Sequence, residues 1–292
     1  MSMSIYEETT GRIITAMQAS DGDVESPWIK SSGSRPVNAL TGNSYHGSNV
    51  ILLWMVAGRE GFATGEWATY KQWQKIGGQV RKDQKATRIV FFKEMTRTEI
   101  DNESGEEKER RWPMARYAFV FNRYQVEGVE QEVSSEPPVL IEDLEHFVQE
   151  TGAKVEIGGT KAGYSSQYDV LKMPDRELFT GTTESDSTTS WYAVLFHELA
   201  HWTGHKSRLN RKLANRFGNE AYAIEELIAE LGSAFLCADL NINTVIRKDH
   251  ADYLKNWIKV LKEDDRAFFS AASAAEKAVQ YLHQLQAVDQ AA

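Results

Sequence analysis

The chain has 292 residues, with 33 Lys and Arg against 42 Asp and Glu, and one cysteine. This length is sufficient for two domains with real cores, and a single cysteine excludes an internal disulfide and favours a reducing compartment. No apolar run follows Met1 and no stretch is apolar enough to cross a membrane, so we expect a cytoplasmic protein with no membrane partner. The net charge of −9 argues against a generally basic nucleic-acid-binding protein, although residues 1–136 account for only −2 of it.

Residues 1–130 are predicted to form a mixed α/β domain. We expect helices at residues 5–17 and 50–57, and a short helix that Thr69 caps and that ends before Gly77. Residues 87–95 and 112–124 are predicted to be strands, with a charged, hairpin-like segment between them. Residues 131–138 are polar and acidic and end in two prolines, so we interpret them as a linker.

Seven basic residues lie between Lys71 and Lys93 against one acid, Asp83, and aromatic residues such as Trp67, Trp73 and Phe91 lie among them or close by. Basic groups that neutralise phosphates, beside rings that stack on bases, are typical of single-strand binding. The alternative is that the tryptophans belong to the core and the lysines to a solvated face. The residues that we assign to DNA binding are Lys71, Trp73, Lys75, Arg81, Lys82, Lys85 and Arg88.

Residues 139–292 are predicted to form a second domain. Helices are expected at residues 140–151, 251–262 and 264–285, and strands at residues 154–157 and 168–173. An extended peptide can pair with the edge strand of a sheet. The segment from Tyr168 to Leu171 is our candidate for such an edge, and an ordinary internal strand is the alternative.

His197-Glu198-Leu199-Ala200-His201 has the HExxH pattern, within a helix predicted over residues 191–202. Four residues apart on a helix, His197 and His201 project from one face and can both reach one metal ion. Glu198 is then placed to act as a general base on a water molecule. The alternative is a helix with two satisfied core histidines, so the downstream sequence has to decide.

A catalytic zinc site usually takes three protein ligands. His205 lies roughly 12 Å from His197 along a continuous helix, which makes it a poor ligand. A second helix, predicted over residues 222–235, places Glu226 and Glu230 on one face. We predict Glu226 as the third ligand of Zn²⁺, or of another divalent ion such as Mn²⁺, and Glu230 as a carboxylate that orients a ligand histidine. Glu225 remains the alternative ligand.

A peptidase site would also need a hydrogen-bond donor to the developing oxyanion. Tyr192, Tyr222 and His205 are available by residue type, and the sequence does not choose among them. We therefore expect His205 in the outer surroundings of the metal rather than among its ligands.

The chain resembles the ArdC-type antirestriction proteins of conjugative plasmids, in the same order over nearly its whole length. The resemblance implies an α+β protein with an N-terminal single-stranded DNA-binding domain and a C-terminal zincin-like metallopeptidase domain. It also implies protection of incoming plasmid DNA from host restriction. The alternative function is a DNA-targeted zinc metallopeptidase that cleaves a DNA-associated protein, with host restriction enzyme subunits as candidate substrates. The matching segments include Pro36-Val37-Asn38, Tyr45-His46-Gly47, Trp67-Ala68-Thr69, Glu225-Glu226-Leu227 and residues 197–205.

Overall fold

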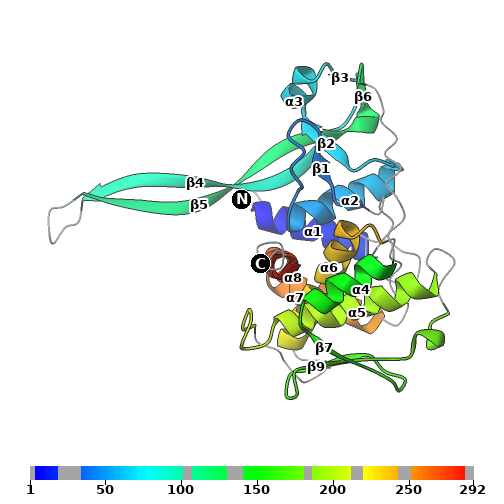
Figure 1. Cartoon of the computed structure of the whole chain (residues 1–292). Coiled ribbons are helices and arrows are strands. Elements are labelled where there is room, and N and C mark those ends of the chain that lie inside the picture. The colour runs from blue at the N-terminus through cyan, green and yellow to red at the C-terminus, as the bar shows by residue number, and fades with distance from the viewer. Residues whose placement is uncertain are drawn as a thin grey trace.

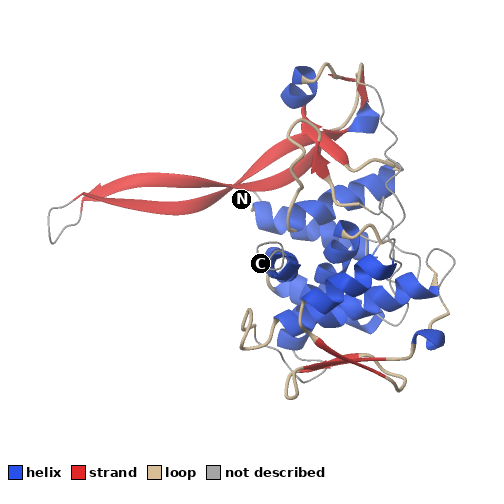
Figure 2. Ribbon diagram, in the orientation of Figure 1, coloured by secondary structure: helices blue, strands red, loops and turns tan. Residues whose placement is uncertain are grey.

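The computed structural model describes residues 4–18, 34–100, 107–129, 141–180, 186–211, 220–242 and 251–286. The N-terminal part is a small sheet with a long two-stranded ribbon, and the C-terminal part is a group of helices with a three-stranded sheet on its far side (Figures 1 and 2). The predicted α+β class is confirmed. None of the described helices combines the length and the apolar composition that a membrane span requires.

The N-terminal sheet has the strand order β1-β2-β5-β4. Helix α2 packs on it through Leu53 and Val56, which meet Trp67, Ile89 and Val120 of the sheet. The elements are α1 (Ile5–Gln18), β1 (Val37–Asn38), α2 (Ser48–Glu60), β2 (Glu66–Thr69), α3 (Tyr70–Lys75), β3 (Gln79–Val80), β4 (Thr87–Ile100), β5 (Glu107–Asn122) and β6 (Val126–Glu127). A 3₁₀ turn, η1 (Arg123–Gln125), precedes β6.

Local sequence signals account for the short elements of this region. Thr69 begins α3 with a capping box, because its hydroxyl accepts from the Gln72 backbone while the Gln72 side chain accepts from the Thr69 backbone. Gly77 ends the turn with a φ of 84°. Both strands of the predicted hairpin extend further than expected, since β4 and β5 remain paired from Thr87 to Ile100.

The C-terminal part consists of helices that surround the metal-binding pattern. They are α4 (Ile141–Glu150), α5 (Ser187–Thr203), α6 (Glu220–Asp239), α7 (Ala251–Glu263) and α8 (Ala267–Gln286), with η2 (Arg176–Leu178) before α5. The strands are β7 (Lys154–Ile157), β8 (Gly163–Ser165) and β9 (Val170–Met173), in the order β7-β9-β8. The prediction that the segment from Tyr168 to Leu171 forms an edge strand is therefore wrong. Val170 and Leu171 lie in the central strand, and both of its sides are already paired.

One hydrophobic core joins the two parts of the chain. Ile13 of α1 and Val50 and Trp54 of α2 are buried in the same cluster as Phe235 of α6 and Phe268 of α8. Helices α1 and α2 lie between the sheet and the C-terminal helices (Figure 1). The predicted linker at residues 131–138 lies outside the described residues.

A buried ion-pair network crosses the same interface. The Arg35 guanidinium, which is almost fully buried, contacts Asp239 at the end of α6 and Glu276 of α8. Glu276 also accepts from the Gly47 backbone and contacts His46 Nδ1 at 2.9 Å. Burial lowers the pKa of Arg35, but the two carboxylates outweigh this and hold it above its ordinary value. The guanidinium is thus a permanent cation at the interface.

Candidate metal centre

Helices α5 and α6 cross closely because small residues meet at the contact. A Cβ atom added to Gly232 would lie 3.1 Å from the Ala200 Cβ. Ser233 donates from its hydroxyl to the Ala193 carbonyl at 2.9 Å, which fixes α6 against α5. Helix α5 begins four residues earlier than predicted, after an Asp186 cap whose side chain accepts from the Thr189 backbone.

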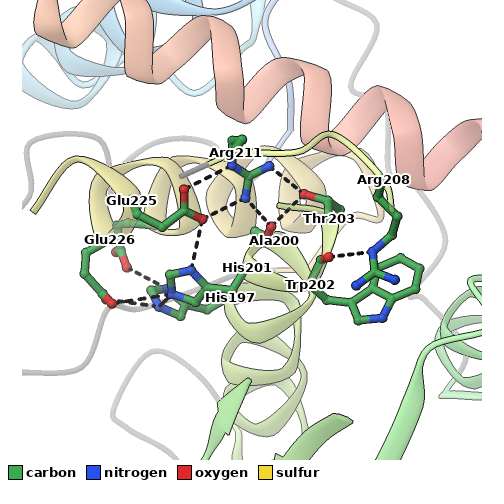
Figure 3. Close-up of polar contacts among 10 residues, drawn as sticks. His197, Ala200, His201, Trp202, Thr203, Arg208, Arg211, Glu225 and Glu226 are labelled. Atoms are coloured by element: carbon green, nitrogen blue, oxygen red, sulfur yellow. Dashed lines mark hydrogen bonds and ion pairs between the residues drawn. The ribbon is translucent and has the colours of Figure 1, made fainter. Parts of the chain in front are cut away.

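The crossing brings His197, His201 and Glu226 together (Figure 3). The two histidine Nε2 atoms are 3.2 Å apart. Glu226 places one carboxylate oxygen 3.5 Å from the Nε2 of His197 and the other 3.5 Å from the Nε2 of His201. A tetrahedral zinc with bonds of about 2.0–2.1 Å separates its ligand atoms by about 3.3 Å, so this donor set fits such an ion.

A second layer of carboxylates faces the other ring nitrogens. Glu230 lies 3.5 Å from the Nδ1 of His197, and Glu225 lies 3.2 Å from the Nδ1 of His201. A carboxylate at Nδ1 holds the proton there and leaves Nε2 free to bind a metal. Glu230 thus occupies the predicted position. The alternative ligand, Glu225, faces the wrong ring nitrogen for the shared centre.

Arg211 holds Glu225 in place, and the sequence analysis did not identify it. Its guanidinium donates to both carboxylate oxygens of Glu225, at 3.1 and 2.8 Å. It also donates to the Ala200 carbonyl at 2.7 Å and to the Thr203 hydroxyl at 2.8 Å, at the C-terminal end of α5. Burial raises the pKa of Glu225, but the hydrogen bonds from His201 and Arg211 outweigh it and hold the pKa below its ordinary value. Glu225 is therefore an anion.

Burial and the neighbouring charges have opposite effects on the pKa values of His197 and Glu226. Burial lowers the pKa of His197, but its hydrogen bonds to Glu226 and Glu230, with the charge of Glu198, raise it well above the ordinary value. Burial raises the pKa of Glu226, and the neighbouring histidines more than reverse this. Since a ligand imidazole must be neutral, metal binding at this cluster would displace a proton.

The three candidate hydrogen-bond donors to an oxyanion lie at different distances from this cluster. Tyr222, one turn before Glu226 on α6, hydrogen-bonds to the Glu226 carboxylate. Tyr192 is buried, and its hydroxyl contacts Arg176 and Glu145 instead. His205 lies in the turn after α5, where its Nδ1 contacts the Ser207 hydroxyl at 2.7 Å. Within the described part of the chain, the structure brings Tyr222 to the cluster but neither Tyr192 nor His205.

The predicted DNA-binding residues also divide into two groups. Trp73 is 0% exposed, and its indole nitrogen donates to the Phe121 carbonyl at 2.9 Å. It packs with Ala68 and Val80, so it cannot stack on a base, and the assignment of Trp73 is corrected. Arg88 is half-buried, pairs with Glu8 and lies over the Tyr117 ring. The cations that remain exposed are Lys71, Lys75, Arg81, Lys82 and Lys85.

Two family models divide the chain between them. One, described as the N-terminal domain of the anti-restriction factor ArdC, matches residues 3–121. The other, described as a zincin-like metallopeptidase, matches residues 142–274. A metal-free crystal structure of the antirestriction protein ArdC from plasmid R388 is 35% identical, covers 98% of each chain and gives a TM-score of 0.81. The chain belongs to the ArdC antirestriction family. The expected two-domain architecture is therefore confirmed.

Other relatives extend the comparison. An Mn(II)-bound crystal structure of the R388 ArdC protein has a TM-score of 0.78 at 32% identity, covering 98% of this chain and 99% of that one. An uncharacterized protein, y4eC of Sinorhizobium fredii, is 40% identical over 96% of this chain and 91% of its own. DNA primase TraC of Escherichia coli is 35% identical over 93% of this chain, which spans 26% of TraC. The zincin-like domain and the Mn(II)-bound ArdC structure support a divalent metal ion as the cofactor.

Proposed function

We propose that this ArdC-family protein binds single-stranded DNA and protects incoming plasmid DNA from host restriction. The observation that carries the proposal is the full-length match to the R388 antirestriction protein, in both fold and domain order. The similarity to part of a protein named DNA primase also favours a role beside DNA. The five exposed cations of α3 and the β3–β4 connection, Lys71, Lys75, Arg81, Lys82 and Lys85, supply contacts for a phosphate backbone.

The metal in this proposal is Zn²⁺, or another divalent ion such as Mn²⁺, held by His197, His201 and Glu226. When bound, such an ion lowers the pKa of a water molecule and polarises a carbonyl group. In a hydrolytic reaction Glu198, half-buried on α5 beside His197, would take the proton from the attacking water and return it to the leaving nitrogen. Elemental analysis should find the ion in the purified protein and lose it in Glu226→Ala.

The second candidate function is a DNA-targeted metallopeptidase whose substrate is a DNA-associated protein, such as a subunit of a restriction enzyme. The presence of Glu198 favours it, because a purely structural metal site has no need of a general base. In this case DNA binding delivers the peptidase domain to its substrate, and protection of the DNA depends on Glu198.

A restriction-protection assay separates the two functions. The assay compares wild type with Glu198→Ala, after metal content and oligonucleotide binding have been measured for both proteins. Full protection by Glu198→Ala indicates a DNA shield, and lost protection with intact metal and DNA binding indicates a peptidase. If wild type neither protects DNA nor binds single strands, the proposal is wrong. The full chain is required, since α1 and α2 bury Ile13, Val50 and Trp54 against the C-terminal helices.

A further inference from the structure

The ribbon of β4 and β5 leaves the body of the protein soon after Val90. Ile89 is still part of the hydrophobic core under α2. Asn49, near the start of α2, hydrogen-bonds to both the N–H and the carbonyl of Val90 and so occupies the open edge of β4. Beyond this point the ribbon projects away from both the sheet and the helices (Figure 1). Two-stranded ribbons are at best marginally stable alone in water, so a long projecting one suits a surface that receives a partner.

The register assigns the side chains of the projecting segment to two faces. Residues directly opposite each other in an antiparallel pair lie on the same face, and neighbours along a strand alternate. The pairs Phe91 with Arg116, Lys93 with Met114 and Met95 with Trp112 therefore share one face, which we call the Phe91 face. The pairs Phe92 with Ala115, Glu94 with Pro113 and Thr96 with Arg111 share the other.

The two faces differ in charge. On the second face Arg111 is compensated, because it lies 3.6 Å from Glu94 and 2.9 Å from Glu109. The three pairs of the Phe91 face include no acid. Its two cations, Lys93 and Arg116, are exposed and form no ion pair with any described residue. Among these six pairs, a surplus of positive charge is thus confined to the Phe91 face.

The Phe91 face combines these cations with one exposed ring, that of Phe91, and one partly buried ring, that of Trp112. Phe91 is 42% exposed, and Trp112 lies on the same face about 13 Å further along at the usual rise of a strand. The cations Lys93 and Arg116 lie between or beside the two rings. Cations that contact phosphates, alternating with rings that stack on bases, match an extended single strand. An acidic peptide matches less well, because it would pair with the cations but has no bases to stack on the rings.

We propose that the Phe91 face of the ribbon is a contact surface for single-stranded nucleic acid. The proposal rests on the single-strand binding proposed above and adds a second surface to it, separate from the exposed lysines of α3 and the β3–β4 connection. A strand that occupies both surfaces meets cations that otherwise have no counter-charge. A duplex that accepts the ribbon in its major groove, and a protein partner, are the competing occupants.

The ribbon supplies matched control variants, because each kind of residue occurs on both faces of the same strand. Phe91→Ala is compared with Phe92→Ala, whose ring is 53% exposed on the opposite face. Arg116→Ala is compared with Arg111→Ala, whose side chain is already paired with acids. Binding of a labelled oligothymidine to the full chain is measured by fluorescence anisotropy at several salt concentrations. Thermal melts confirm that each variant is folded.

We expect Phe91→Ala to weaken binding about 5- to 150-fold, the range expected for losing one stacked base, without changing the salt dependence. Arg116→Ala should flatten the log–log salt slope by about 0.7, the value of one phosphate contact on a single strand. Phe92→Ala and Arg111→Ala should bind like wild type.

Equal effects of the two phenylalanine variants, or unchanged binding by both Phe91→Ala and Arg116→Ala, overturn the inference. If Lys82→Ala weakens binding in that case, the proposed function still holds and only the ribbon surface is wrong. If the wild type does not bind the single strand, both proposals fail. Tighter binding to a duplex of the same length also overturns the inference.

Discussion

Replacing Arg211 should weaken metal binding although the side chain does not touch the three proposed ligands. Arg211 acts through Glu225, which contacts the Nδ1 of His201 at 3.2 Å. In Arg211→Ala the buried Glu225 carboxylate keeps the histidine but loses both guanidinium hydrogen bonds. Burial then raises the Glu225 pKa with less to oppose it. A neutral Glu225 is a weaker acceptor, so His201 loses both orientation and basicity.

The general cost of losing such a partner sets the expected size of this effect. Removing a partner that orients a ligand histidine typically costs about 10- to 100-fold in metal affinity, and we expect Arg211→Ala and Glu225→Ala to fall in this range. Glu226→Ala removes a direct ligand and should lose more. Since Arg211 acts through Glu225, the double variant should bind the metal about as well as Glu225→Ala alone.

Competition with a chromophoric chelator measures these affinities for Zn²⁺ and Mn²⁺, and melts in the presence of EDTA measure the stability of each metal-free variant. Arg208→Ala is the matched control. Arg208 also donates to a carbonyl near the end of α5, that of Trp202, but pairs with Asp169 instead of Glu225. It should lower stability without changing metal affinity. Losses that add fully in the double variant, or wild-type affinity in Arg211→Ala, would refute the relay.

Three further predictions concern the stability of the protein. Trp73→Ala should destabilise the protein by about 3–5 kcal/mol in chemical denaturation, because it empties a fully buried indole site. Arg35→Met should cost about 3–5 kcal/mol in the same assay, since it leaves Glu276 without its buried partner. The pKa of Asp169 is held at about 2 by the hydrogen bond from Arg208, against an ordinary value of 3.8. Its stabilising contribution is therefore complete above about pH 4 and lost as the pH falls toward about 2, and acid melts of Asp169→Asn should lack this loss.

The cluster of His197, His201 and Glu226 could be predicted because each helix contributes its residues through a short, regular spacing in the sequence. The spacing of His197 and His201 fixes their common face on any α-helix, and the same periodicity places Glu226 and Glu230 on one side of α6. Small residues at the crossing, such as Gly232 against Ala200, let the two helices approach closely. Arg211 was not predictable in this way, because its contacts depend on how the chain returns after α5, which no helical period encodes.

The basic and aromatic run shows the opposite case. Composition placed Trp73 among the cations of residues 71–88, but composition does not determine on which side of a short helix a ring lies. The capping box between Thr69 and Gln72 fixes the start of α3 and turns Trp73 inward onto Ala68 and Val80. The three lysines and one arginine that follow it in the segment, and Lys71 before it, remain exposed, so five of the seven assigned residues are accessible to a ligand.

The extent of β4 and β5 was also beyond the sequence analysis. The charged residues between the predicted strands suggested a hairpin-like segment rather than longer strands, because alternating apolar and polar residues are the usual signal for a half-buried strand. A ribbon with both faces in solvent has no buried face and therefore no such alternation. The two strands nevertheless pair antiparallel along their whole length, from Thr87 to Ile100 of β4. The projecting ribbon and its asymmetric faces could only be recognised in the structure.

The shared core couples the unfolding of the two domains that the family models match. Helix α6 carries the proposed metal ligand Glu226 near its start and Asp239 at its end, where Arg35 of the N-terminal region is bound. Helix α1 reaches the other end of the chain, since Thr10 donates to the Asp265 carbonyl at 2.7 Å. Apolar burial and ion pairs that cross one interface oppose separate unfolding of its two sides. The N-terminal and zincin-like regions are therefore best understood as one cooperative unit, in which α6 packs against α2, the helix that covers the N-terminal sheet.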